Sequence, residues 1–171
     1  MPTILWTGNP FCSRAIREPG WKLVHKVCNK PCTFTWEQLV QLCGEPPDAV
    51  VLGDISTPPM LLGVERYPCL TVFYCVDSHI HSWHADYAQA FDLCCLNLKD
   101  NLPAFRQRLQ GDRLLWLPAY AASSLVPQPV AEEDKLYDLL FAGNVHPAVH
   151  PGRHAFLTAL GRRCSSLTIT R

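Results

Sequence analysis

The sequence predicts an α/β protein built on a doubly wound, mostly parallel β-sheet. The main observation is the run Cys69–Val76 (CLTVFYCV), which is apolar over eight residues without alternation. Such a run is typical of a strand that is buried on both faces, as parallel strands between helix layers are. Similar apolar runs alternate with capped, amphipathic stretches along the chain, which is the pattern of β-α-β units.

The strands of this sheet are bounded by turn signals. They are expected at residues 3–7, 21–27, 48–52, 69–76, 92–98 and 113–117. The first is closed by Gly8-Asn9-Pro10 and the third ends at Gly53-Asp54, both of which are typical turn sequences.

Helices are expected between several of the strands. Thr35 and Gln38 have the spacing of a capping box, so a helix is expected to begin there and to end at Gly44. A second helix is expected over residues 82–91. A third is expected over Pro103–Leu109, because proline is tolerated in a first turn. Asp100 or Asn101 is expected to cap it.

The character of the chain changes near residue 121. Ala121–Glu133 has two prolines, two serines, two glutamates and no periodicity, which indicates a linker. A strand over Tyr137–Ala142, a helix from about Gly152 to Arg163 and a strand over Leu167–Thr170 are expected to follow. We therefore expect a Rossmann-like domain at 1–125, a linker at 126–135, and the beginning of a second α/β domain at 136–171. Two strands and one helix do not bury a core alone, so this second unit is incomplete.

Composition excludes several classes of protein. The 171 residues are 48% hydrophobic and 18% charged, with a formal net charge of +0. A neutral chain lacks the basic stripe of a dedicated nucleic-acid binder. No run approaches the roughly 18 to 20 apolar residues of a membrane span, and no signal peptide is visible. A cytoplasmic location is therefore expected.

The densest cluster of reactive side chains is Asp77–His84 (DSHIHSWH), just after the most buried predicted strand. Ligands of open α/β sheets bind at the carboxyl ends of strands. Asp77 and His79 are therefore the candidate catalytic residues, and His81 and His84 are candidate substrate contacts. The structural alternative is that Asp77 or Ser78 caps the next helix and that the histidines lie in an ordinary loop.

The same segment also raises the question of a metal site. The imidazoles of His79, His81 and His84 are metal ligands in principle. However, His79 and His81 point to opposite sides of an extended chain, and His81 and His84 share a face only in a helix. We expect no metal.

Two glycine-containing loops are further candidates for ligand binding. Gly143 and Asn144 lie between a predicted strand and a predicted helix, where the backbone can approach a phosphate near a helix N-terminus. Arg153 could add a phosphate contact there, or it could be a solvated helix residue. Gly8 and Asn9 form a similar loop after the first strand. A plain turn is the alternative interpretation of both.

Taken together, these motifs resemble a known family. The string Pro68–His84 resembles the N-terminal domain of bacterial glycosyltransferases of the GT-B fold, most closely the group related to the spore-maturation protein CgeB. The resemblance covers roughly Asp48–Arg163. The further motifs that carry it are Tyr87–Asp92, Lys99-Asp100, Pro103–Phe105, Trp116–Pro118, Tyr137–Asn144, Arg153 and Phe156-Leu157.

The resemblance implies two Rossmann-like domains that face a cleft. The first would bind a hydroxyl acceptor (a glycan, protein or small molecule) and the second a nucleotide-sugar donor, without a cofactor. It places Asp77 or His79 as base or donor contact, and Gly143 and Asn144 near the donor phosphates. Most of the donor domain has no counterpart in these 171 residues, including an acidic residue that such enzymes commonly use on the donor. We therefore expect little or no transferase activity from this chain alone.

Two other functions fit the same sequence. The chain could be a non-catalytic binding or regulatory module with the same N-terminal fold, which could form a homo-oligomer through an open sheet edge. A metal-dependent hydrolase that uses His79, His81 and His84 is the weaker alternative.

Overall fold

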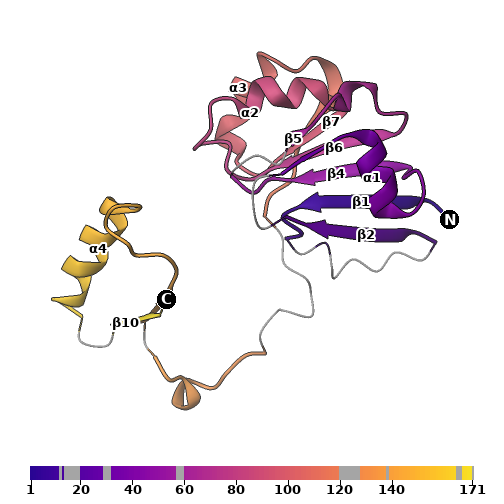
Figure 1. Cartoon of the computed structure of the whole chain (residues 1–171). Coiled ribbons are helices and arrows are strands. Elements are labelled where there is room, and N and C mark those ends of the chain that lie inside the picture. Colours follow the sequence, from indigo (N-terminus) through magenta and orange to yellow (C-terminus); the bar gives the residue numbers. More distant parts are fainter. Residues whose placement is uncertain are drawn as a thin grey trace. The chain divides into compact units, whose positions relative to one another are not determined.

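The computed structural model describes residues 1–11, 13, 20–28, 32–56, 60–119, 128–137, 139–164 and 167–170. The chain divides into two compact units, Met1–Val126 and Pro127–Arg171 (Figure 1). Each unit is described by itself.

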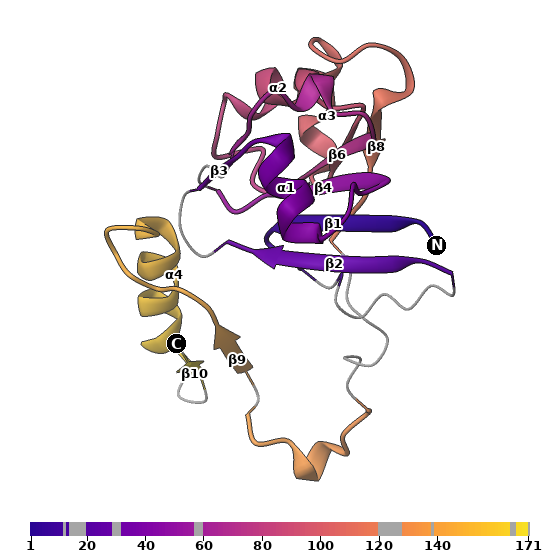
Figure 2. The ribbon, with the colours of Figure 1, turned by 45° about the vertical axis from the view of Figure 1, so that its right-hand side comes forward.

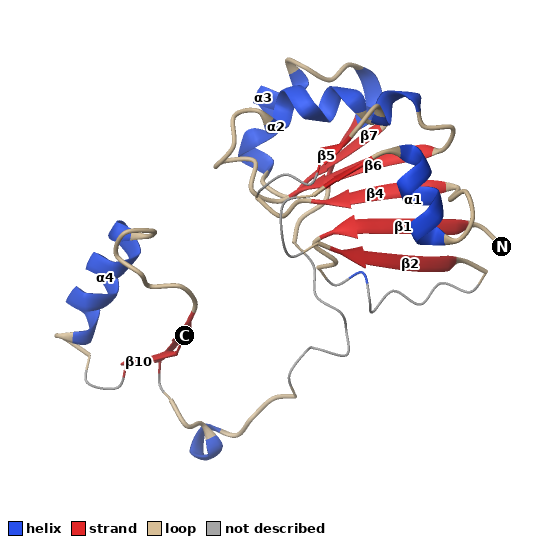
Figure 3. Ribbon diagram, viewed as in Figure 1, coloured by secondary structure: helices blue, strands red, loops and turns tan. Residues whose placement is uncertain are grey.

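The first unit is built on a six-stranded sheet in which every pair of neighbours is parallel (Figure 3). Its order is β2-β1-β4-β6-β7-β8. The strands are β1 (Thr3–Gly8), β2 (Lys22–Val27), β4 (Ala49–Gly53), β6 (Leu70–Cys75), β7 (Leu93–Leu96) and β8 (Leu114–Trp116). The predicted fold class, a doubly wound Rossmann-like sheet, is confirmed.

The strand order changes direction between β1 and β4. From β1 the chain first builds β2 on one side, and all later strands of the sheet follow on the other side, beginning with β4. In open α/β sheets such a switch point leaves a crevice at the carboxyl ends of the two strands, and ligands bind there. The carboxyl ends of β1 and β4 meet at Gly8 and Gly53, which are register partners.

The first helix forms as its capping signal predicts. In α1 (Trp36–Cys43) the Thr35 side chain accepts from the backbone N–H of Gln38, and the Gln38 side chain accepts from the backbone N–H of Thr35. Gly44 ends the helix in the left-handed conformation, with φ of 84°. The side chains of Leu39 and Cys43 are buried against the sheet.

The other helices of this unit are shorter than predicted. Only α2 (His84–Tyr87) and a 3-10 turn (Ala88–Ala90) occupy the segment expected to be one helix over 82–91. The third helix, α3 (Leu102–Arg106), ends before the expected Leu109. Asn101 stands at the N-cap position of α3, as expected, but its side chain donates to Ser78 Oγ at 2.8 Å and makes no capping hydrogen bond.

Smaller elements complete the unit. A two-residue parallel pair, β3 (Thr33–Phe34) with β5 (Met60–Leu61), was not anticipated from the sequence. Short 3-10 turns lie at Val64–Arg66, Lys99–Asn101 and Gly111–Arg113.

The core of the first unit consists of two clusters, because successive residues of a strand face opposite sides of the sheet. In β4, Val50 and Leu52 belong to the larger cluster, which the described helices cover, whereas Val51 belongs to the smaller one. Five of the eight described cysteines are buried, and Cys75, Cys94 and Cys95 lie within the sheet. Burial raises the pKa of all three thiols.

The second unit contains β9 (Leu139–Ala142), α4 (Pro151–Gly161) and β10 (Leu167–Thr170), with a 3-10 turn at Glu132–Asp134 (Figure 2). The two strands pair in parallel. Within α4 the buried residue is Leu157. The strand–helix–strand order agrees with the predicted beginning of an α/β unit. The assignment of donor and acceptor roles to the two units stays a prediction.

No described helix is long and apolar enough to cross a membrane. This finding agrees with the sequence, in which the apolar runs have the length of single strands.

The close approach of β1 and β4 leads to a testable prediction. A Cβ at Gly53 would overlap the carbonyl oxygen of Asn9 and lie 2.9 Å from Trp6 Nε1. We expect Gly53→Ala to lower the free energy of unfolding by about 1–3 kcal/mol, as overpacking does. Gly152→Ala is the control, since its Cβ would meet nothing within 4 Å. Urea unfolding measures both, and an unchanged midpoint for Gly53→Ala would contradict this account.

Candidate functional site

A pocket of about 400 Å³ lies at the switch point of the first unit. Its walls are the segments that follow the carboxyl ends of β1, β2, β4 and β6, so four parallel strands deliver residues to one place. The lining residues are Asn9, Pro10, Phe11, Val27, Cys28, Asp54, Ile55, Ser56, Val76 and Asp77. Two of these described lining residues are carboxylates, and none of them is a lysine or an arginine.

The carboxylate of Asp54 organises this pocket. Its Oδ1 accepts from the backbone N–H of Ser56 at 2.8 Å. Its Oδ2 accepts from the backbone N–H groups of Val76 at 3.1 Å and Asp77 at 2.9 Å. The loop after β4 is therefore tied to the loop after β6 by a single buried side chain.

Ser56 and Asp77 form the wall above this carboxylate. Ser56 has a φ of 59°, a left-handed conformation that is uncommon for serine. Its Oγ donates to Asp77 Oδ2, so this hydrogen bond and the one to Asp54 fix the loop on both sides. Asp77 is half-buried at the pocket surface.

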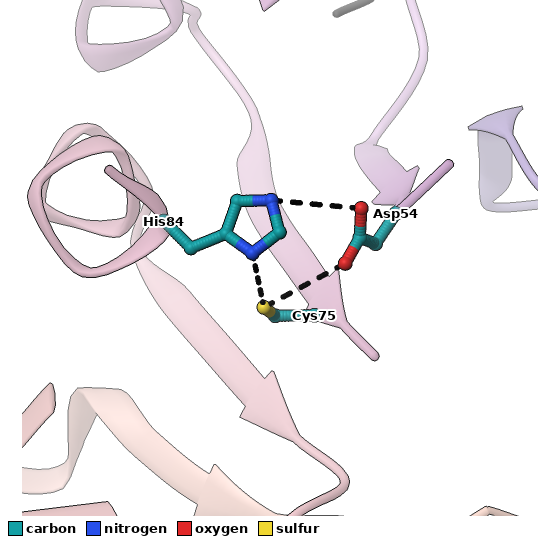
Figure 4. Close-up of side chains that lie close together, drawn as sticks. All are labelled: Asp54, Cys75 and His84. Carbon is teal, nitrogen blue, oxygen red and sulfur yellow. Dashed lines mark hydrogen bonds and ion pairs between the residues drawn. The ribbon is translucent and has the colours of Figure 1, made fainter. Parts of the chain in front are cut away.

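Asp54 also belongs to a buried cluster with Cys75 and His84 (Figure 4). The three side chains come from the end of β4, the end of β6 and the start of α2. Cys75 Sγ lies 3.3 Å from His84 Nδ1 and 3.8 Å from Asp54 Oδ2. His84 Nε2 lies 3.6 Å from Asp54 Oδ1, which is too long for a hydrogen bond.

Burial sets the protonation states of this cluster. His84 is fully buried, and desolvation lowers its pKa, although the nearby Asp54 carboxylate acts in the opposite direction. Desolvation also raises the pKa of the Cys75 thiol, and the Asp54 charge adds to this effect. Burial therefore favours the neutral imidazole of His84 and the protonated thiol of Cys75 at neutral pH.

The surroundings of His84 are aromatic. Its ring packs edge-on against Phe73, with centroids 5.5 Å apart, and against Trp83 at 4.3 Å. The ring of His81 lies 5.0 Å away. The Nε2 atoms of both histidines are buried without a hydrogen-bond partner.

The structure separates the predicted residues of the first unit into two groups. Asp77 and Asn9 line the pocket, and Gly8 ends the strand below it. His79 is exposed and does not line the pocket, whereas His84 is buried beneath it in the cluster.

Two alternatives from the sequence do not fit this geometry. Residue Trp83 occupies the N-cap position of α2, and no side chain caps that helix, so neither Asp77 nor Ser78 is its cap. Within the described part of the chain, the one group of three side chains with metal-ligand chemistry is Asp54, Cys75 and His84. The set proposed for a hydrolase shares only His84 with it.

Sequence reasoning missed Asp54, Ser56 and Cys75. A signal for Asp54 existed, because Gly53-Asp54 ends a predicted buried strand, as Asp77 follows another. Adjacent parallel strands end at the same edge of the sheet, so Asp54 and Asp77 must lie close together if their strands are neighbours. That order is not encoded in any local pattern.

Arg153 is not among the lining residues, but the other two predicted residues of the second unit, Gly143 and Asn144, line a pocket. It has a volume of about 740 Å³, and its lining includes Gly143, Asn144, His146 and His154. Arg153 Nη1 donates to the Asn144 carbonyl at 3.0 Å, and its guanidinium lies over the ring of Phe141. The loop between β9 and α4 is thereby held by an arginine of the helix.

Comparison of the chain with protein-family models, with curated proteins and with solved structures gives no match. The chemistry of the two pockets is therefore argued from their own residues.

The buried His84 predicts a pH dependence of stability. Because its pKa is lowered in the folded state, the unfolded chain takes up a proton first as the pH falls through about 6.5. We expect the free energy of unfolding to decrease below that pH, by at most about 1.4 kcal/mol per pH unit from this group.

Urea unfolding between pH 5 and pH 8 in a metal-free buffer tests this expectation. His84→Gln removes the titrating group, so its stability should vary less with pH than that of the wild type. His79→Gln changes an exposed histidine and should keep the wild-type dependence. Equal pH dependence in the wild type and His84→Gln would refute the assignment.

Proposed function

We propose that the first unit is the acceptor-side domain of a glycosyltransferase with two Rossmann-like domains, and that its pocket holds a hydroxyl-bearing acceptor. The observation that carries the proposal is the lining of that pocket. Among the described lining residues are two carboxylates, a hydroxyl and an amide beside the ring of Phe11, and none of these described residues is basic. Carboxylates accept hydrogen bonds from hydroxyl groups, whereas a phosphate needs donors and positive charge.

Asp77 is the base in this proposal. Its carboxylate lines the pocket and is oriented by Ser56, as a base is held by a neighbouring group. The acceptor oxygen attacks the anomeric carbon of the donor sugar while its proton passes to Asp77. The new glycosidic bond forms as the bond to the nucleoside diphosphate breaks, and the electron pair leaves with the phosphate. The exposed His79 has no contact with this pocket, which favours Asp77 over it.

The second unit supplies the donor side. Gly143 and Asn144 line its pocket just before the N-terminus of α4, an eleven-residue helix. The pocket is lined by this loop and by His154, Leu157 and Thr158 of the helix. A diphosphate, the anion that a sugar nucleotide presents, accepts hydrogen bonds from N–H and amide donors such as those of the loop. The imidazoles of His146 and His154 add neutral or positive donors to the same pocket.

The role of Asp77 is tested by saccharide binding. We expect saturation-transfer NMR to show contacts between the chain and members of a panel of mono- and disaccharides. Asp77→Asn should weaken that binding by roughly tenfold, because it replaces a charged acceptor by an amide. Asp86→Asn, an exposed carboxylate on α2, is the matched control and should bind as the wild type does.

The same experiment separates the proposal from its alternatives. Saccharide contacts that are identical in the wild type and Asp77→Asn place the ligand elsewhere and reject the assigned base. No contact with any saccharide rejects an acceptor pocket. A non-catalytic module would bind a saccharide, but joining it to a complete donor domain would yield no transfer of sugar.

The donor side has its own test. Arg153→Ala removes the guanidinium that holds the Asn144 carbonyl, so we expect the affinity for a nucleotide sugar to fall roughly tenfold or more. Arg162→Ala, at the other end of the same helix, should leave it unchanged. Calorimetric titration with several nucleotide sugars measures both variants. Equal affinities for the wild type and Arg153→Ala would remove this loop from the donor site.

A further inference from the structure

Cys75 and His84 take no part in the chemistry proposed above, and together with Asp54 they combine three kinds of metal ligand. We propose that these three side chains form a binding site for a divalent transition-metal ion, with Zn²⁺ as the cation that suits them best. The site is buried beneath the pocket, and Asp54 belongs to both.

The donor set selects the class of metal. A thiolate, an imidazole and a carboxylate together suit Zn²⁺ and related transition metals. Mg²⁺ and Ca²⁺ prefer oxygen ligands and are disfavoured by the sulfur and nitrogen donors. The inference is therefore specific for a borderline-soft cation.

The separations between the three side chains agree with such an ion. A tetrahedral metal with ligands at about 2.0–2.3 Å keeps its ligand atoms about 3.3–3.6 Å apart. One ion takes only one nitrogen of the ring. His84 Nε2 lies 3.6 Å from Asp54 Oδ1, and Cys75 Sγ lies 3.8 Å from Asp54 Oδ2 and 3.3 Å from the other ring nitrogen, Nδ1. One donor atom from each of the three residues lies within 4.8 Å of the other two. Figure 4 shows the three groups converging on one another from three different elements. Binding would draw the three donor atoms together, from within 4.8 Å of one another to the shorter separations of a tetrahedral site.

An unused nitrogen is the second observation. His84 is fully buried, and its Nε2 has no hydrogen-bond partner and is directed at Asp54. Burying a polar atom without a hydrogen-bond partner is costly, and coordination to a metal ion would give His84 Nε2 a partner. The fourth tetrahedral position would be left to water.

Charge balance supports the same conclusion. Asp54 is buried, and no lysine or arginine of the described chain forms an ion pair with it. A Zn²⁺ ion with one thiolate, one carboxylate and a neutral imidazole forms a site of zero net charge. A neutral site is what a buried position tolerates, because an uncompensated charge there is strongly disfavoured.

Such an ion would be structural. It would join the carboxyl ends of β4 and β6 to the first turn of α2, a helix of only four residues. A helix of one turn has little stability of its own. The metal ion would hold α2 against the ends of β4 and β6, which the few hydrogen bonds of a one-turn helix do not do.

The test uses the whole chain after chelation and removal of metal. We expect it to take up one equivalent of Zn²⁺ and to gain thermal stability. Co²⁺ used in its place should give a thiolate-to-cobalt charge-transfer band and the intense d–d bands of a tetrahedral site. These readouts do not depend on any enzymatic activity.

Variants identify the ligands. Cys75→Ser and His84→Gln should abolish the charge-transfer band or shift it to much higher Co²⁺ concentrations. Cys94→Ser changes an equally buried thiol on β7 and should retain the charge-transfer band. The double variant Cys28→Ser, Cys32→Ser should also retain the band, which excludes these two neighbouring thiols as the cobalt ligands.

The outcomes decide the proposal. A band and a rise in thermal stability that survive Cys94→Ser and the double variant support it. No uptake of either metal by the wild type overturns it, as does a band that survives Cys75→Ser. If Cys75→Ser fails to fold, His84→Gln and the double variant decide. A band that is lost in the double variant but retained in His84→Gln overturns the assignment.

Discussion

The carboxylate of Asp54 is the interaction on which the described site depends. Three backbone N–H groups from two different loops converge on its two oxygens. Hydrogen bonds to a charged group are worth more than neutral ones, and leaving buried N–H groups unpaired is costly. One side chain therefore fixes where Ser56 and Asp77 lie, and with them the wall of the pocket.

The position of this carboxylate follows from the topology of the sheet. The strand order reverses beside β4, so the loop that carries Asp54 borders the crevice at the switch point. The contact of Gly8 with Gly53 brings the ends of β1 and β4 close enough for Asn9 N–H to donate to the Gly53 carbonyl at 3.0 Å. Larger side chains would separate the two loops and widen the pocket floor.

The sequence predicted the elements better than the site. Apolar runs and the Thr35 capping box are local signals, and the sheet strands and α1 follow them within one or two residues. Helix α2 is shorter than predicted because it begins only at His84 and passes into a 3-10 turn at Ala88. Asp54 and Cys75 escaped notice because their importance comes from the adjacency of β4 and β6, a non-local property. Asp77 was found because it stands in an obvious polar cluster, but its relation to Ser56 could not be predicted.

The burial of cysteine in the sheet has a consequence for the chemical reactivity of the chain. The thiolate is the form that attacks alkylating reagents and oxidants, and the raised pKa values of Cys75, Cys94 and Cys95 keep these residues protonated at neutral pH. The sulfur atoms of Cys94 and Cys95 act as apolar filling between strands while the fold is closed. The rate at which such thiols are modified then reports how often the parallel sheet opens, independently of any ligand or catalytic assay.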